Sequence, residues 1–363
     1  MHVFFKLIIS SSLLWVSAQA QDLVVPNGLK IEIFSDQVDS PRQMTQGTRG
    51  NIFVGSRKSG NVFVIQDQDK NGVADASRKL ASGLNQPAGV SFYRGDLFIA
   101  EIDKIWKITN VEEWLANNPT SMPELELVSD ALPDDEWHGW KWLAHDEAGN
   151  LYTNVGAPCN VCLKDDPRYA SIVKFNGEVW EVIARGVRNS VGFDFHPLTG
   201  ELYFGDNGRD WLGDDTPSCE LNRLVSEGAH FGFPYLHDSK TIDPEFGDLS
   251  HGFSLQAPIL ELGAHVAPTG LTFYDHDYLG AEYTNNIFIA LHGSWNRSSK
   301  VGYKVIRVSL DEQGGVRQVS DFMTGFLEGE NVLGRPAAPM VMEDGSLLVA
   351  DDKQSLIYRI SKT

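Results

Sequence analysis

The sequence predicts an all-β fold, a six-bladed β-propeller, because one short strand pattern recurs six times along its 363 residues. Each copy is a turn with Gly, Asn or Asp, then alternating apolar residues, then a small or polar residue, which is typical of hairpin-linked strands. The copies lie at residues 50–55, 95–100, 149–154, 200–205, 285–290 and 345–350. Their spacings, measured between Ile52, Leu97, Leu151, Leu202, Ile287 and Leu347, are 45, 54, 51, 85 and 60 residues. Four-stranded blades have about this length, so we expect insertions after the fourth and fifth copies.

The rest of the chain agrees with many short strands. Its 34 glycines and 16 prolines are spread along the sequence and favour strands joined by turns. Residues 110–118 alone carry helix-like spacing with an N-cap candidate, Asn110. Because neighbouring repeats bury their faces against each other, they can share one extended core. We therefore expect a single catalytic domain over residues 21–363.

Residues 1–20 have the pattern of a cleaved signal peptide. Lys6 precedes an apolar run at 7–16, and Ala18-Gln-Ala20 supplies a small-residue cleavage site. This run is too short for a membrane span, which needs about 20 apolar residues. The sequence therefore predicts export to a periplasm or beyond as a soluble protein.

The charge of the chain excludes some partners. The formal net charge is -19, and removal of Lys6 with the signal peptide makes it -20. An excess of carboxylates repels phosphate backbones and anionic lipids. Nucleic acid and membrane surfaces are therefore unsuitable partners.

Three cysteines, Cys159, Cys162 and Cys219, cannot form a complete disulfide framework. Cys159 and Cys162 are spaced either for a structural bridge within one loop or for a redox-active pair, and export permits a bridge. Leu163 follows the pair where haem attachment requires histidine. We expect Cys219 to be a free thiol.

Two segments before repeat strands carry candidate catalytic groups. His138 lies among tryptophans and carboxylates, fourteen residues before Tyr152 of the third copy. Histidine suits proton abstraction near neutral pH, although a packed histidine with one hydrogen bond explains the pattern equally well. Arg188 and Asn189 directly precede another strand, where a guanidinium can bind a carboxylate or polarise a carbonyl. A surface ion pair is the alternative for Arg188.

Two loops are candidate calcium sites. Residues 205–215 crowd four aspartates and several glycines into one loop, which suits an oxygen-preferring cation. A second loop resembles the start of a calcium-binding loop, although Arg78 replaces its last glutamate. A plain hairpin connection is the alternative there. The candidate ligands of this second loop are Asp67, Asp69, Asn71 and Asp75.

Further basic and polar residues follow the repeat strands, at the end of the channel where a propeller concentrates its chemistry. In so acidic a protein, converging cations indicate an anionic ligand. No glycine pattern typical of nicotinamide or nucleotide triphosphate binding is present. The candidates are Arg57, His292, Trp295, Asn296, Arg297, Lys300 and Arg335.

Taken together, five segments resemble the soluble pyrroloquinoline-quinone (PQQ)-dependent glucose/sorbosone dehydrogenase family, and more its sorbosone-dehydrogenase-like branch. The resemblance covers essentially the whole mature chain, and the order of the segments makes it specific. The segments are WHGWKWLAHDEAGNLYTNVGAPCNVC, ARGVRNSVGFDFHP, YFGDNGRDWLGDD, FGFPY and ALHGSWNRSSKVGYKV.

The resemblance implies a role for each matching residue. His138 is the expected catalytic base, and Arg188 and Asn189 contact the carbonyls of PQQ. The backbone carbonyls of Gly208 and Arg209 bind a channel calcium ion, although glucose-oxidising members have proline where Arg209 stands.

Arg335 is expected to bind the cofactor's carboxylates, but Ala337 replaces a second arginine of the glucose-oxidising members. The basic residue after the fifth copy is Arg297 or Lys300, and Arg57 is expected to assist.

The implied activity is oxidation of a sugar or sugar-derived aldehyde. His138 takes a proton from the substrate while a hydride passes to PQQ, and calcium and Arg188 stabilise the developing charge. A separate, unnamed electron acceptor, a cytochrome or a quinone, is needed. Two alternatives are a calcium-dependent lactonase-like propeller hydrolase and a non-enzymatic binding propeller that has lost its cofactor.

Overall fold

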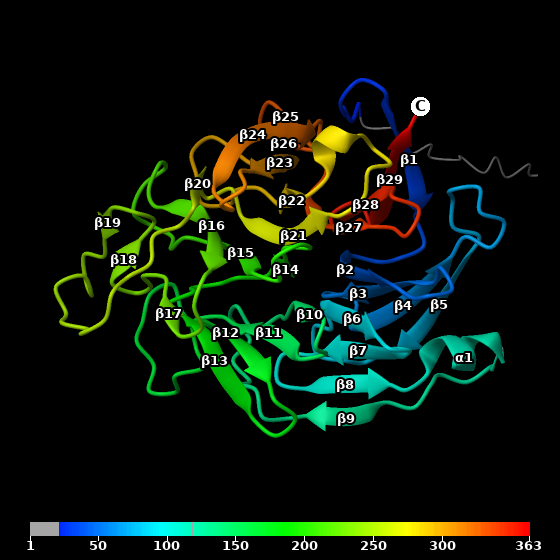
Figure 1. Ribbon diagram of the computed structural model, residues 1–363, viewed down its shortest axis with the longest axis horizontal. Helices are drawn as coiled ribbons and strands as arrows, with labels where there is room; N and C mark the ends of the chain where they lie inside the picture. Colours follow the sequence, from blue (N-terminus) through cyan, green and yellow to red (C-terminus); the bar gives the residue numbers. More distant parts are fainter. Residues whose placement is uncertain (1–21, 118) are drawn as a thin grey trace, which may run out of the picture.

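The computed structural model describes residues 22–117 and 119–363, and in this part of the chain almost all regular structure is β-strand. Six sheets stand around a central axis as the blades of a propeller, which confirms the predicted fold (Figure 1). The predicted signal peptide at residues 1–20 lies outside the described residues. Among the described residues, no helix is long and apolar enough to cross a membrane.

Blades 1 to 3 follow one another along the chain, and each runs from an inner strand at the axis to an outer one. Blade 1 comprises β2 (Pro41–Gln46), β3 (Ile52–Ser56), β4 (Asn61–Gln66) and β5 (Ala76–Ala81). Blade 2 comprises β6 (Gly89–Tyr93), β7 (Asp96–Ala100), β8 (Ile105–Ile108) and β9 (Glu126–Ser129). Blade 3 comprises β10 (Leu143–His145), β11 (Leu151–Val155), β12 (Ser171–Phe175) and β13 (Trp180–Arg185), with β17 (Ala229–His230) added in parallel at its outer edge.

Blades 4 to 6 complete the ring. Blade 4 comprises β14 (Phe193–Phe195), β15 (Leu202–Asp206), β16 (Ser218–Leu224) and β20 (Leu260–Ala264). Blade 5 comprises β21 (Pro268–Tyr274), β22 (Asn286–Leu291), β23 (Lys304–Leu310) and β24 (Val316–Met323). Blade 6 comprises β27 (Pro336–Val341), β28 (Leu347–Asp351), β29 (Leu356–Lys362) and β1 (Leu29–Ser35).

The six repeated segments are the second strands of the blades: β3, β7, β11, β15, β22 and β28. Almost every residue of these strands is buried, because each strand pairs on both edges and the neighbouring blades cover its faces. This double burial explains the apolar runs that made the repeat visible in the sequence. The polar residues that follow these strands emerge together at one end of the channel.

The predicted insertions are also present. The first lies inside blade 4 and contains β17 and the hairpin of β18 (Leu236–His237) and β19 (Thr241–Ile242). The second carries the hairpin of β25 (Leu327–Glu328) and β26 (Asn331–Val332) between blades 5 and 6. The predicted helix at 110–118 is α1 (Val111–Ala116), and a short 3-10 helix, η1 (Ala281–Tyr283), precedes β22.

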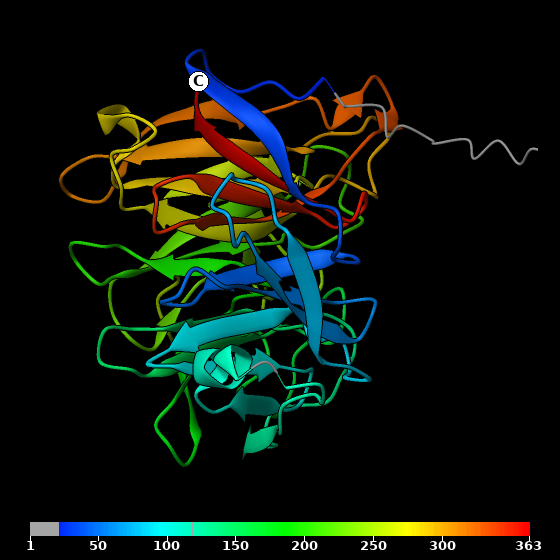
Figure 2. The ribbon, with the colours of Figure 1, turned by 90° about the vertical axis from the view of Figure 1, so that its right-hand side faces the viewer.

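The two ends of the described chain close the ring. β1 pairs antiparallel with β29 from Leu29 opposite Lys362 to Ser35 opposite Ile357. The blue and red strands lie side by side in both views (Figures 1 and 2). Blade 6 thus takes its outer strand from the beginning of the chain. This pairing leaves no gap between the first and last blades.

The final residues of β1 anchor this closure in the core. Phe34 is 1% exposed and belongs to a core cluster that also includes Val54, Phe204 and Ala350, from three different blades. The preceding residue, Ile33, is 42% exposed. These two successive residues of β1 therefore bury very different fractions of their side chains.

We expect Phe34→Ala to lower the free energy of unfolding by about 3–5 kcal/mol, because it leaves a cavity in the shared core. Ile33→Ala in the same strand is the matched control and should change that free energy by less than about 0.5 kcal/mol. Urea unfolding followed by tryptophan fluorescence measures both. Equal losses in the two variants would contradict the anchoring of the closure by Phe34.

Candidate functional site

Nineteen residues enclose a cavity of about 210 Å³ on the channel axis, beyond the ends of β3, β15 and β22. We call it the central cavity. Blades 1, 3, 4, 5 and 6 all contribute to it, so it exists because the ring closes. Its lining residues are Arg42, Arg57, His138, Trp140, Arg188, Asn189, Val191, Asn207, Gly208, Asp210, Cys219, His265, Ala267, Thr269, His292, Gly293, Trp295, Asn296 and Arg335.

His138 lies in the loop before β10 and is 8% exposed. Its backbone is left-handed, with φ 58°, a conformation that is uncommon in residues other than glycine. The ring Nδ1 lies 2.7 Å from the carbonyl oxygen of Ala157. Since a carbonyl only accepts, Nδ1 carries the proton and Nε2 keeps its lone pair. The indole Nε1–H of Trp137 donates to that Nε2 at 3.2 Å.

The surroundings of His138 keep the imidazole neutral. Burial, followed by the positive charges of Arg188 and then Arg57, lowers its pKa to about 3, and the hydrogen bond to Ala157 offsets only part of this effect. At neutral pH Nε2 is therefore unprotonated, as a general base requires, and its lone pair accepts the hydrogen bond from Trp137.

Arg188 is held by backbone groups on two sides. Its Nε donates to the carbonyl of Asn160 at 2.8 Å, and its Nη1 donates to the carbonyls of Asn207 at 3.1 Å and Gly208 at 3.0 Å. The backbone N–H groups of Arg188 and Asn189 donate to the carboxylate of Asp206 at 2.8 and 2.7 Å. Asp206 thus fixes the turn that places both side chains against the cavity.

A buried polar chain connects three blades. The guanidinium of Arg42 pairs with Asp352 at 2.7 Å, and the other oxygen of Asp352 is 2.8 Å from Nε2 of His292. The Nη1 of Arg335 lies 3.5 Å from Nδ1 of His292, and its Nη2 donates to the hydroxyl of Tyr303 at 3.2 Å. The chain brings two guanidinium groups to the same wall of the cavity.

Arg57 is a further cationic group of the central cavity. Its guanidinium carbon lies 3.7 Å from the ring centroid of Trp140, and its Nε donates to Gln86 at 2.8 Å. Burial and the nearby charge of Arg42 lower the pKa of Arg57 to about 10, so it remains charged at neutral pH. The stacking on Trp140 holds a charged group in a fixed position.

The composition of the central cavity fits an anionic, polar ligand. Four guanidinium groups face it, and Asp210 supplies the one carboxylate among the described lining residues. Several buried polar atoms of the lining also have no hydrogen-bond partner, namely Trp140 Nε1, Asn189 Oδ1 and Asn296 Oδ1. Unpaired buried polar atoms are costly, so a ligand that pairs with them is favoured.

Three residues predicted for the site do not line the cavity. Arg297 pairs with Asp215 at 2.8 Å, and Lys300 pairs with Glu330 at 3.5 Å. The side chain of Arg209 pairs with the carboxylate of Asp243. The cavity lies instead against Gly208, whose carbonyl faces the guanidinium of Arg188.

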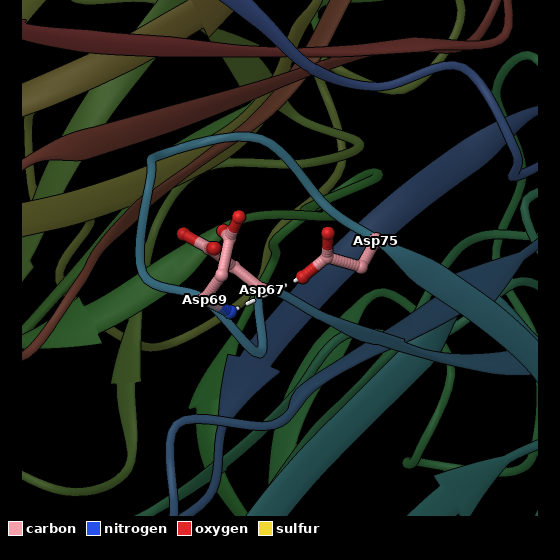
Figure 3. A group of neighbouring side chains, drawn as sticks. All are labelled: Asp67, Asp69 and Asp75. Atoms are coloured by element: carbon pink, nitrogen blue, oxygen red, sulfur yellow. Dashed lines mark hydrogen bonds between the residues drawn. The ribbon is translucent and has the colours of Figure 1, made fainter.

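The second predicted calcium loop lies elsewhere, between β4 and β5, and none of its residues lines the central cavity. Carboxylate oxygens of Asp67, Asp69 and Asp75 lie within 4.8 Å of one another (Figure 3). They also accept backbone hydrogen bonds, such as Gly72 N–H to Asp67 at 2.8 Å and Gln68 N–H to Asp75 at 2.7 Å. These bonds also suit a plain hairpin connection, so calcium binding there stays a prediction.

Cys159 and Cys162 form a disulfide, and Cys219 is a buried free thiol. The bridged loop has a structural role at the site, because Asn160 within it accepts from Arg188 Nη2 at 2.9 Å and from the backbone N–H of Asp210 at 2.8 Å. The structure thus contains a disulfide bridge within one loop.

Sequence reasoning missed several lining residues, above all Arg42, Trp140 and His265. Trp140 was available as a neighbour of His138. Arg42 lies in an inner strand before the first repeat, where no motif marked it. His265 precedes β21 and has a left-handed backbone, with φ 64°, a property that the sequence does not display.

Comparisons with known proteins agree with this fold. A family model described as TrAA12-like matches residues 239–363. The holo PQQ domain of pyranose dehydrogenase from Coprinopsis cinerea has a TM-score of 0.77 at 19% identity, over 94% of this chain and 97% of that one. A calcium structure of a Trichoderma reesei protein of carbohydrate-active enzyme family AA12 has a TM-score of 0.79 at 18% identity, over 96% of this chain and 99% of that one. PQQ-bound aldose sugar dehydrogenase from Streptomyces coelicolor has a TM-score of 0.66 at 14% identity, over 93% of this chain and 99% of that one.

At these identities the solved structures establish a shared fold. A sequence relative establishes more. A Borreliella burgdorferi protein, described only as uncharacterized, is 35% identical over 385 residues, which cover 99% of this chain and 97% of the relative. The chain therefore belongs to the same protein family as this Borreliella burgdorferi protein.

Proposed function

We propose that the protein is a PQQ- and calcium-dependent dehydrogenase that oxidises a sugar or a sugar-derived aldehyde, such as a sorbosone-like one, and passes electrons to a separate acceptor. The observation that carries this proposal is the central cavity, which is lined by four arginines and a neutral histidine. The names of the structural neighbours support the cofactor and the sugar. We also propose that the protein is exported after cleavage of residues 1–20. N-terminal sequencing of an exported form that begins at Gln21 would support this proposal.

Two groups of cavity residues would bind different parts of PQQ. Arg42, Arg57 and Arg335 would hold the carboxylates of PQQ, while Arg188 and Asn189 would face its carbonyl oxygens. The backbone carbonyls of Gly208 and Arg209 would bind calcium. When bound, PQQ accepts a hydride and calcium polarises the quinone.

The chain itself supplies the proton acceptor. His138 Nε2 takes the proton of a substrate hydroxyl, and the Ala157 carbonyl holds the opposite ring nitrogen so that the tautomer is fixed. The substrate hydroxyl must first replace the indole N–H of Trp137 at Nε2, because one lone pair accepts one such bond. Trp137 thus keeps the base occupied until a better-placed donor arrives.

The hydrolase alternative has less support. A lactonase-like calcium site requires several side-chain carboxylates, and only Asp210 supplies one among the described lining residues of the cavity. Mixing the protein with PQQ and calcium and screening dye reduction across a panel of sugars tests the proposal. Dye reduction with bound quinone absorbance supports it, lactone hydrolysis without PQQ supports the hydrolase, and no bound quinone supports a binding propeller.

We expect His138→Asn to reduce turnover by about 10²- to 10⁴-fold, the usual contribution of a general base. Asparagine tolerates the left-handed backbone at this position better than most residues, so folding and PQQ binding should persist. Stopped-flow reduction of bound quinone measures the turnover, and quinone absorbance measures the binding. Turnover close to that of the unmodified protein would remove His138 from the mechanism.

The pH dependence follows from the lowered pKa of His138. A base with a pKa near 3 stays deprotonated through the neutral range, so kcat/KM should not fall near pH 6.5, where an ordinary histidine becomes protonated. Arg57→Gln removes one of the repelling charges and should move the acid limb to higher pH. Arg57→Lys keeps the charge and is the control. An acid limb near pH 6.5 in the unmodified enzyme would contradict this prediction.

We expect Arg335→Gln to weaken PQQ binding by about 10- to 100-fold, corresponding to about 1.5–3 kcal/mol for a hydrogen bond to a charged group. Arg297→Gln should weaken binding much less, because Arg297 pairs with Asp215 outside the cavity. Arg317→Gln, at an exposed position of β24, controls for the loss of charge. Quinone titration by absorbance compares the three variants, and a dominant effect of Arg297 would reassign the carboxylate-binding residue.

A further inference from the structure

Two tryptophans lie exposed beside the central cavity. Trp211 is 68% exposed and Trp295 is 66% exposed, and both rank among the most exposed large apolar residues described. Their ring centroids are 5.4 Å apart and their planes cross at 84°. Trp295 also lines the cavity. Together they form an apolar corner at its entrance, which we call the tryptophan corner.

The tryptophan corner is held by polar contacts between two loops. Trp211 belongs to the loop after β15 and Trp295 to the loop after β22. The amide of Asn296 donates to the carboxylate of Asp210 at 2.5 Å, and Ser298 N–H donates to Asp214 at 3.0 Å. Both tryptophans thus neighbour a residue that ties the two loops together. The exposure of the rings is therefore a fixed feature of the fold.

The backbone at Trp211 adds a second indication. Its φ is 71°, in the left-handed region that a bulky side chain rarely occupies. Strained residues of this kind are concentrated at binding and catalytic sites. Burial of the ring does not explain the conformation, because Trp211 is mostly exposed to solvent. The fold thus holds an exposed aromatic ring beside the cavity on a backbone conformation that has a steric cost.

The neighbouring polar groups define the class of that ligand. Asn296 lines the cavity, and its Oδ1 is buried without a partner while its amide is bound to Asp210. The site thus offers apolar ring surfaces together with an unused hydrogen-bond acceptor. A pyranose ring matches this combination, because it has a C–H face that packs on an aromatic ring and hydroxyl groups that donate hydrogen bonds.

We propose that the tryptophan corner is a binding subsite for a glycosyl unit next to the reacting one, so that the substrate is the end of an oligosaccharide. This inference rests on the proposed function for the identity of the reacting unit. The reacting unit enters the central cavity toward His138, and the next unit packs on Trp211 and Trp295. A free monosaccharide would leave the tryptophan corner uncovered.

Binding to the full-length protein without PQQ tests this subsite separately from catalysis. The probes are cellotriose, maltotriose, xylotriose and mannotriose, each compared with its own monosaccharide by calorimetry and tryptophan fluorescence. We expect at least one trisaccharide to bind about tenfold or more tightly than its monosaccharide. Trp211→Ala should bring this ratio close to one, and Trp211→Phe should retain most of it. Leu198→Ala, at a residue 76% exposed outside the cavity, should leave the ratio unchanged.

Equal affinities for all trisaccharides and their monosaccharides would overturn the subsite, as would a preference that survives Trp211→Ala. The same sugars are then assayed with PQQ, calcium and a dye. Tight trisaccharide binding that depends on Trp211 without any dye reduction would refute the proposed function and leave the subsite standing. Sugar oxidation with a KM that does not depend on chain length would refute the subsite and leave the proposed function standing.

Discussion

The central cavity depends on the closure of the ring, in which β1 pairs with β29 and completes blade 6. This closure brings Arg42 of blade 1 against Asp352, just after β28 of blade 6, and the two side chains are only 8% and 7% exposed. Breaking such a buried pair by removal of one partner costs about 3–5 kcal/mol, because the other charge is left without compensation. The ion pair therefore links the integrity of the fold to the geometry of the site.

The charged groups next to this ion pair determine the ionisation state of Asp352. Burial acts to raise the pKa of Asp352, but Arg42 and His292 outweigh it and hold the pKa well below the ordinary value for aspartate. Asp352 is thus ionised at neutral pH and compensates one guanidinium of the wall. Among the described residues Arg335 and Arg57 have no carboxylate within ion-pair distance, whereas Arg188 pairs with Asp210 at 3.3 Å. The wall is consequently both internally balanced and attractive to an anion.

Much of the fold was visible in the sequence because the second strand of each blade is buried on both faces, and its apolar residues follow a turn residue. The positions after these strands indicated where Arg57 and His292 would gather, and both line the central cavity. Arg42 could not be predicted, because it lies in an inner strand, β2, whose residues carry no distinctive sequence motif. The sequence left Arg297 and Lys300 as alternatives for one cofactor-binding residue, since only the path of the loop decides that they pair with Asp215 and Glu330.

The cations of the cavity and the neutrality of its histidine have a common physical origin. Burial lowers the pKa of His138 most, and the charges of Arg188 and then Arg57 lower it further because they oppose protonation of the ring. The same charges attract an anionic ligand to the same space. An anion bound between them would offset part of their repulsion, but burial, the largest cause of the lowered pKa of His138, would remain, so the imidazole stays neutral through the neutral range. Anion binding and the neutral state of the base are therefore linked through the arginines.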